Sequence, residues 1–479
     1  MDAARTNTDV SPNPVCRGCV AAAKRMAELE RQNALLQARI ALLEQKLEAA
    51  LRAGKRQAAP FSRGLPKSDP KPPGRKAGED YGTKAFRAAP PPEVIDEVYD
   101  APLPERCPRC GARGSVILSR VAQQYQVEIP RKPIYRQFNV SVGHCACCQT
   151  RLQGRHELQT SDALGCAASQ IGPEAQAAVV MLNKDLGLSQ GKVSRFFASL
   201  FGIQLSRGGS CQIMLRAARR CEGNYQAIVK HVQQGPWIVP DETGWRIGGL
   251  LAWLHVAAGE DALAYLIHAQ RGFDASALLI GPDYTGHLIH DGWAGYDRFW
   301  RATHQTCLAH LLRRCRELLE RAVGGAVLFP RQVQALLQEA LATRDRRDAG
   351  PRKIQPATAR RRAEGLQERM EKLLQPIKTH ADNERLAEHL WKHRGQLFTF
   401  LRQRGIDATN YRAEQALRPA VVNRKVWGGN RTLAGAAAQS ILMTVLFTAT
   451  RNGRDALEFV SQVLRAVPNR RPLLLAASG

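Results

Sequence analysis

The segment Pro236-Trp-Ile-Val-Pro-Asp241 decides the fold, because the chain changes there from helical to strand-like patterning. Two apolar strands follow at 249–257 and 262–269, then a helix at 273–280, and the short strand Gly286-His-Leu-Ile-His290 ends at Asp291. Residues 303–307 add a candidate fifth strand and residues 308–322 a helix behind it. This order of elements predicts a mixed α/β core.

Asp241 and Asp291 fall at the ends of the first and fourth strands of this core. Three strands, a helix and a fourth strand form a ribonuclease-H-like order, in which those two strands lie side by side. Two neighbouring carboxylates are what Mg²⁺ or Mn²⁺ needs for phosphoryl transfer. Glu242 is a poor further ligand, because the next residue on a strand points to the opposite face, and His290 is expected to be structural for the same reason.

A third acid is available in the helical stretch Tyr411-Arg-Ala-Glu-Gln-Ala-Leu-Arg418. Arg418 lies one turn after Glu414 and shares its face, and Arg424 and Lys425 follow closely. A carboxylate with basic neighbours also occurs on ordinary surface helices. The pattern alone therefore leaves the role of Glu414 open.

Two cysteine pairs, Cys107-Pro-Arg-Cys110 and Cys145-Ala-Cys-Cys148, flank a segment that is predicted to be β-rich at 116–142. Two such pairs can supply the four thiolates of a tetrahedral structural Zn²⁺ site, which predicts a zinc ribbon. The alternative is that they are free cysteines. His144 and Cys147 stand beside the second pair, and the earlier Cys16 and Cys19 are weak evidence for a metal by themselves.

A heptad column near the start of the chain predicts a leucine-zipper-like coiled coil. Its a positions are Met26, Asn33, Ile40 and Leu47, and its d positions are Leu29, Leu36, Leu43 and Ala50. The single Asn among the a positions favours a parallel dimer. An amphipathic helix packed on its own domain is the alternative.

Residues 52–92 are rich in proline and basic side chains, which is typical of an extended linker. It is either a phosphate-contacting arm or a spacer. Further on, residues 172–218 are helical by period, and Leu186-Gly-Leu-Ser189 resembles the turn of a helix-turn-helix; an ordinary helical hairpin fits equally.

Lys and Arg number 69 against 43 Asp and Glu, a formal net charge of +26, so a polyanion is the expected partner. Neither a signal peptide nor a convincing membrane span is recognisable, and a cytoplasmic protein with thiols or metal ligands in place of disulfides is expected. Far more residues separate Asp291 from Glu414 than a compact core needs, so a helical basic insertion is predicted. Its basic residues suit a DNA backbone groove, with a solvated face as the alternative: Arg344, Arg346, Arg347, Arg352, Lys353, Arg360, Arg361 and Arg362.

Four segments together resemble the transposases of the insertion sequence 66 family. They are Val239-Pro-Asp-Glu-Thr-Gly-Trp-Arg246, His290-Asp-Gly-Trp-Ala-Gly-Tyr296, Cys307-Leu-Ala-His-Leu-Leu-Arg313 and Ala413-Glu-Gln-Ala-Leu-Arg-Pro419 with Asn423-Arg-Lys425. The resemblance implies a DDE transposase whose triad is Asp241, Asp291 and Glu414, with Mg²⁺ or Mn²⁺ as cofactor. It also implies a positioning role for Cys307 and His310, for which core packing is the alternative, and DNA contacts by Arg418, Arg424 and Lys425.

The predicted protein is thus a multidomain α+β transposase that cleaves insertion-sequence ends and transfers the strand into target DNA. A non-catalytic DNA-binding relic or regulator is the alternative. Expected partners are transposon-end and target DNA, a second copy through the coiled coil, and accessory proteins of the element, in a bacterial cytoplasm and at the nucleoid when DNA is bound. The predicted segments are a coiled coil at 1–53, a linker at 54–92, a zinc ribbon at 93–155, a helical DNA-binding segment at 165–230, a ribonuclease-H-like core at 231–322, a helical insertion at 323–405, and a catalytic-glutamate helix with C-terminal helices at 406–479.

Overall fold

The computed structural model describes residues 17–54, 89–114, 116–127, 129, 132–159, 164, 171–348 and 354–466. The chain divides into two units, Met1–Ile129 and Pro130–Gly479, and each is described by itself. Most of the predicted linker, together with Cys16, Arg352 and Lys353, lies outside the described residues.

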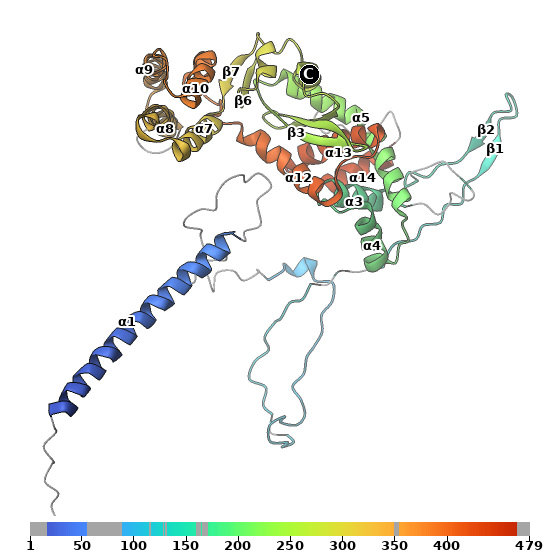
Figure 1. Ribbon diagram of the computed structural model, residues 1–479. Helices are drawn as coiled ribbons and strands as arrows, with labels where there is room; N and C mark the ends of the chain where they lie inside the picture. Colours follow the sequence, from blue (N-terminus) through green and yellow to red (C-terminus); the bar gives the residue numbers. More distant parts are fainter. Residues whose placement is uncertain are drawn as a thin grey trace, which may run out of the picture. The chain divides into compact units, whose positions relative to one another are not determined.

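The first unit contains one long helix, α1 (Arg17–Gly54), and a short 3₁₀ turn, η1 (Pro92–Val94) (Figure 1). The predicted helix is therefore confirmed. Up to residue 44, where the side chains of α1 are described, the heptad positions are exposed, including Met26 at 63%, Leu36 at 59% and Leu43 at 56%. Association of α1 with a second copy stays a prediction, which this exposed column supports.

The prediction of a β-rich segment between the cysteine pairs was wrong for the residues that the structure describes. Residues 116–127 and 132–141 contain no strand, and only β1 (Val142–His144) and β2 (Arg151–Gln153) form a two-stranded antiparallel ribbon around the second pair. The β-branched side chains of the segment lie in solvent, with Ile117 86% and Val121 83% exposed. Strand propensity without a hydrogen-bonded neighbour does not make a sheet.

The segment at 172–218 is helical, as the sequence predicted, and the described residues form three helices there, the last of which extends further: α3 (Pro173–Lys184), α4 (Gln190–Phe201) and α5 (Arg207–Gln234). Ser189 and Ser206 cap α4 and α5, because their hydroxyls accept the amide protons of Lys192 and Gly209. Gly202 ends α4 in the left-handed conformation. Whether α3 and α4 act as a helix-turn-helix stays a prediction.

The sheet has five strands in the spatial order β5-β4-β3-β6-β7. Its members are β3 (Trp237–Ile247), β4 (Leu250–Ala258), β5 (Leu263–His268), β6 (His287–His290) and β7 (Thr303–Thr306). β3, β4 and β5 pair antiparallel, whereas β6 and β7 run parallel to β3. The predicted five strands, and the side-by-side placement of the first and fourth, are thereby confirmed, and the fold is mixed α+β.

Alternation along β3 divides the core between the two faces of the sheet. Val239 and Trp245 pack with the helices that follow the sheet, α7 (Leu308–Arg321) and α12 (Tyr411–Trp427) among them. Ile238 packs on the other face with α5, with α6 (Phe273–Ile280) and with α13 (Leu433–Arg451). The sheet is thus a middle layer between two sets of helices (Figure 1).

The predicted insertion is helical where it is described. It comprises η4 (Gly324–Val327), α8 (Leu328–Asp348), α9 (Pro356–Leu374), α10 (Ala381–Lys392), η5 (Arg394–Gln396) and α11 (Thr399–Arg402). α12 and α13 return to the sheet, and α14 (Ala456–Arg465) packs on α3 and α13.

α13 is long and apolar enough to cross a membrane, and no other described helix meets that test. An apolar stretch of 18 residues in this helix is 67% buried inside the unit, where the helix packs on α5 and β5. It therefore has the surroundings of a core helix.

Candidate active site

Asp241 lies on β3, and Asp291 directly follows β6, the parallel neighbour of β3. The two acids come from adjacent strands at the same level, since Ile238 pairs with Leu288. Burial raises the pKa of Asp241 well above its ordinary value, and the negative charges of Glu242, Asp291 and Glu414 raise it further. The charges of Asp291 and Glu414 thus both act on Asp241, and these three acids are called the acidic cluster below.

Glu414 belongs to the first turn of α12 and lies across from His310 of α7, with 3.8 Å between its Oε1 and the Nε2 of His310. Burial lowers the pKa of His310, while the charges of Asp291 and Glu414 oppose that shift. His310 thus lies next to Glu414, and its positioning role stays a prediction.

Cys307 contacts the cluster through Asn410, a residue that the sequence interpretation missed. The Sγ of Cys307 donates to Oδ1 of Asn410 at 3.2 Å, and Nδ2 of Asn410 lies 3.4 Å from Oδ2 of Asp241. Burial raises the pKa of Cys307 to about 11, so its thiol stays protonated and is no nucleophile at neutral pH. Asn410 occupies the N-cap position of α12, but its side chain makes no cap bond. An asparagine just before a helix is commonly a cap, so no local signal connects Asn410 with Asp241.

A directed chain of hydrogen bonds holds the turn after Asp291. Gly292 N–H donates to Nδ1 of His290 at 3.1 Å, Nε2 of His290 lies 2.9 Å from Nδ1 of His304, and Nε2 of His304 lies 3.0 Å from the Phe299 carbonyl oxygen. A backbone donor at one end and a backbone acceptor at the other leave one consistent assignment, in which both imidazoles are neutral and carry the proton on Nε2. This agrees with a structural role for His290, whose burial lowers its pKa well below the ordinary value.

The acidic cluster offers carboxylate oxygens, which are the donors that Mg²⁺ and Mn²⁺ prefer. In the ranges that the structure describes, however, no three His, Cys, Asp or Glu side chains stand together in an arrangement that could hold a metal ion. The donor chemistry fits a divalent cation, and its coordination stays a proposal.

The predicted zinc ribbon stays a prediction, because its two cysteine pairs belong to different units of the chain. Each cysteine pair nevertheless forms the same turn. In the first, Cys107 N–H donates to the Ala112 carbonyl and Gly111 N–H to the Cys107 carbonyl; in the second, Cys145 N–H donates to the Thr150 carbonyl and Gln149 N–H to the Cys145 carbonyl. The residue after each pair has positive φ, 74° at Gly111 and 56° at Gln149, which an L residue rarely adopts.

The predicted basic residues have unequal surroundings. Arg347 does not suit a DNA contact, because its side chain is 5% exposed, donates to the Phe400 carbonyl and pairs with Asp348. The sequence could not anticipate that burial. Arg344 pairs with Asp345 and Arg360 donates to the Arg402 carbonyl. Arg424 is half-buried, which lowers its pKa, and the remaining described members are exposed: Arg346, Arg361, Arg362, Arg418 and Lys425.

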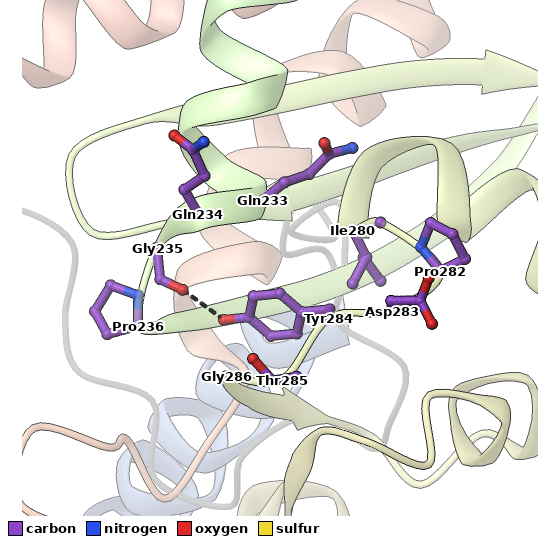
Figure 2. A pocket seen from close by; sticks show the side chains of 11 residues that line it. Gln233, Gln234, Gly235, Pro236, Ile280, Pro282, Asp283, Tyr284, Thr285 and Gly286 are labelled. Carbon is purple, nitrogen blue, oxygen red and sulfur yellow. Dashed lines mark hydrogen bonds between the residues drawn. The ribbon is translucent and has the colours of Figure 1, made fainter. Parts of the chain in front are cut away.

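A pocket of about 540 Å³ lies at the opposite end of the parallel strand pair (Figure 2). Its walls are residues 233–236 before β3 and 280–286 before β6, and the Tyr284 hydroxyl donates to the Gly235 carbonyl oxygen at 2.9 Å. The acids stand at the carboxyl end of β6, so this pocket is separate from the cluster.

The fold and the site together define an α+β protein with a carboxylate cluster on a mixed sheet and a helical insertion beside it. The chain belongs to the Transposase IS66 family, whose family model matches residues 168–438. That range contains all three acids and excludes both cysteine pairs. The uncharacterized protein y4qI of Sinorhizobium fredii (strain NBRC 101917 / NGR234) is similar, with 24% identity over 306 residues that cover 57% of this chain. The chain spans 55% of the length of that relative.

Proposed function

We propose that this chain is a DDE transposase that cleaves DNA at the ends of an insertion sequence and joins the freed 3′ end to target DNA. The observation that supports this most is the placement of Asp241 on β3 and of Asp291 directly after β6, the parallel neighbour of β3, with Glu414 close enough to affect the pKa of Asp241. The strand order, three antiparallel strands followed by two parallel ones, supports a ribonuclease-H-like assignment for the core.

Asp241, Asp291 and Glu414 would hold Mg²⁺ or Mn²⁺. When bound, such ions activate the attacking oxygen and stabilise the leaving oxygen of an in-line displacement. Asn410 would hold the carboxylate of Asp241 in place, and Cys307 would hold Asn410. His310 would orient Glu414 from the start of α7.

DNA at transposon ends and targets is the proposed substrate. A formal net charge of +26 favours a polyanion, and the exposed basic side chains of α8, α9 and α12 would contact phosphates. Self-association through α1 and a zinc ribbon at the two cysteine turns belong to the same proposal. Such a protein would act in the bacterial cytoplasm on nucleoid DNA, with accessory proteins of the element as further partners.

The test is incubation of the full chain with labelled transposon-end duplex and Mg²⁺ or Mn²⁺. Asp241→Asn, Asp291→Asn and Glu414→Gln should each abolish nicking and strand transfer, because a misplaced cation cannot support in-line transfer. Binding in a gel shift should persist, since affinity comes from basic side chains. Asp283→Asn is the matched control, because Asp283 is 78% exposed and pairs with Arg301 beside the separate pocket.

Cleavage that survives all three substitutions would contradict the triad. A wild-type chain that binds end DNA but never cuts, with either cation and with the accessory proteins present, would favour a non-catalytic DNA-binding relic or regulator.

A further inference from the structure

Glu242, the neighbour of Asp241, is a buried carboxylate with both oxygens engaged. Its side chain is 3% exposed. Oε1 accepts from Nε and Nη2 of Arg271, at 2.8 and 2.6 Å, and Oε2 accepts from the Tyr296 hydroxyl at 2.6 Å. Glu242 therefore faces away from α12, as strand alternation predicts, and both of its oxygens already accept hydrogen bonds from protein side chains.

Arg271 connects this carboxylate to the turn that carries Asp291. Its guanidinium lies between two indoles, 4.9 Å from the ring centroid of Trp253 on β4 and 4.7 Å from that of Trp293. Trp293 stands two residues after Asp291, and its backbone amide donates to Oδ1 of Asp291 at 2.9 Å. The guanidinium of Arg271 thus contacts β4, Glu242 of β3 and the turn after Asp291.

Tyr296 makes the second connection between the same two segments. It is 1% exposed, sits in η3 (Ala294–Arg298) and packs edge-on against Trp293 with 5.3 Å between ring centroids. Its hydroxyl is the donor to Glu242. Glu242 therefore joins the strand of Asp241 to the turn of Asp291 by two independent routes.

Stability alone does not account for this arrangement. A buried ion pair contributes little net free energy of folding, and its replacement by apolar residues of similar volume often leaves stability unchanged. Here Glu242 is a fourth acid beside Asp241, Asp291 and Glu414, and its charge is one of the causes that raise the pKa of Asp241. Arg271 offsets that charge, which leaves the charges of Asp241 and Asp291 available to a cation.

We propose that Glu242, Arg271 and Tyr296 are positioning residues that set the separation of Asp241 and Asp291. This inference rests on the proposed function of the acidic cluster. Loss of one connection is expected to weaken cation binding and cleavage about tenfold, the lower range for residues that orient metal ligands. Tyr296→Phe is the mildest change, because it removes one hydroxyl and keeps the ring, and the fold should persist with a stability loss that thermal unfolding measures.

The experiment compares Tyr296→Phe with Tyr284→Phe in the full chain. Both substitutions remove the donor hydroxyl of a buried tyrosine, but Tyr284 donates to the Gly235 carbonyl at the other end of the strand pair. Mn²⁺ binding is followed by the electron paramagnetic resonance signal of the free ion, and end cleavage is measured against Mn²⁺ concentration. Thermal unfolding of each variant serves as the folding control.

Tyr296→Phe should shift both Mn²⁺ curves to about tenfold higher concentration, and Tyr284→Phe should shift neither. Glu242→Gln and Arg271→Lys should shift them in the same direction, because each weakens the ion pair. Equal behaviour of the two tyrosine variants, with wild-type binding and cleavage intact, would overturn the positioning role alone. A wild-type chain that neither binds Mn²⁺ nor cuts would overturn this inference together with the proposed function.

Discussion

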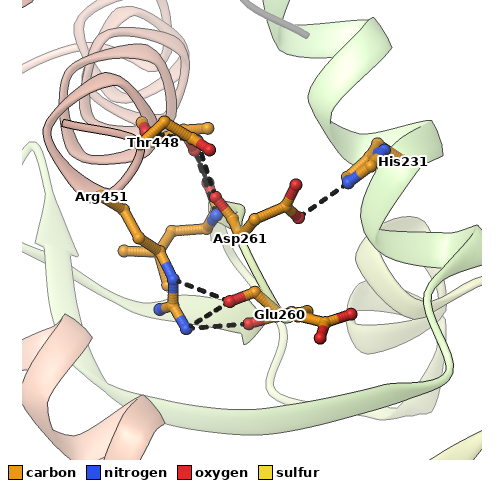
Figure 3. Close-up of polar contacts among 8 residues, drawn as sticks. His231, Glu260, Asp261, Thr448 and Arg451 are labelled. Carbon is orange, nitrogen blue, oxygen red and sulfur yellow. Dashed lines mark hydrogen bonds and ion pairs between the residues drawn. The ribbon is translucent and has the colours of Figure 1, made fainter. Parts of the chain in front are cut away.

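Thr448 and Leu263 exchange two hydrogen bonds: Oγ1 of Thr448 accepts from the Leu263 amide at 3.0 Å and donates to the Leu263 carbonyl oxygen at 3.1 Å (Figure 3). Thr444 and Ser440, each one turn earlier on α13, accept from the amides of Tyr265 and Ile267 in the same way. Four residues of an α-helix span about 6 Å, and two residues of a strand span about 6.7 Å. A hydroxyl at every fourth position of α13 therefore lies opposite the backbone amide of every second residue of β5. α13 thereby provides hydrogen-bond partners for the outward backbone amides of β5, the edge strand of the sheet, in place of a sixth strand.

Removal of one of these hydroxyls should destabilise the fold. Thr444→Val keeps the volume but leaves the buried Tyr265 amide without its acceptor, and we expect a loss of about 1–3 kcal/mol in the free energy of unfolding, measured by urea denaturation. Thr450→Val is the control, because the Thr450 hydroxyl bonds to the Leu446 carbonyl of its own helix. Equal losses for the two variants would contradict the role of the hydroxyl in holding β5.

Lys184 should make the stability depend on alkaline pH. Its side chain is 5% exposed, its Nζ donates to the neutral amide of Gln439, and burial lowers its pKa from 10.5 to about 8. The unfolded chain then binds more protons between those values, so the free energy of unfolding should rise with pH across that window, by roughly 3 kcal/mol. Lys184→Met should stabilise the protein at neutral pH and flatten that rise, whereas exposed Lys230→Met should do neither. A rise that persists in Lys184→Met would show that another group titrates.

The two neutral histidines behind Asp291 should make the stability fall in acid. The pKa of His290 is depressed by burial, so the unfolded chain takes up the proton first as pH drops below about 6.5, and stability is lost in that direction. A His290→Leu, His304→Leu double variant should show a smaller loss between about pH 7 and pH 5, by urea denaturation. His255, whose burial lowers its pKa to about 4, still titrates in that variant, so some loss should remain. If the double variant lost as much free energy of unfolding between about pH 7 and pH 5 as the wild type, the neutral state assigned to His290 and His304 would be wrong.

The two cysteine turns should bind one structural Zn²⁺ between them. Hydrogen bonds, above all the one with the Thr150 side chain, lower the pKa of Cys148 to about 7, which favours the thiolate that zinc needs. We expect about one Zn²⁺ per chain by metal analysis, lost in a Cys107→Ser, Cys148→Ser double variant. Cys147→Ser, beside the second turn, should retain it. Full zinc content in the double variant would refute the four-thiolate site, and a second equivalent would point to Cys16 and Cys19.

The exposed heptad column of α1 should hold the protein as a dimer. Leu36→Glu with Leu43→Glu should convert the full chain to a monomer in sedimentation, because both replace d positions. Leu35→Glu with Leu42→Glu is the matched control, since those leucines are 68% and 51% exposed on α1 but lie off the column. Asn33→Ile should tighten association while loosening its stoichiometry. A monomeric wild type at micromolar concentration would refute this role.

Much of the fold was predictable from the sequence, because its signals are local. Strand alternation, apolar periodicity and the change at Pro236 predicted the five strands and the helices between them. The ribonuclease-H-like order of these elements then predicted that the first and fourth strands lie side by side. Glu414 needed the family resemblance, since an acid among basic residues on a helix has no local feature that separates an active site from a surface.

Only the tertiary structure decided which partners the polar side chains have. Asn410 stands where a cap is expected and instead reaches Asp241, Arg347 of a basic run is buried against the Phe400 carbonyl, and Glu242 is held by Arg271 and Tyr296. The β propensity at 116–127 forms no strand there, because pairing needs a neighbour that propensity does not supply. Periodicity determines which face a residue occupies, but the group that meets that face comes from a distant part of the chain, and that choice is made by packing.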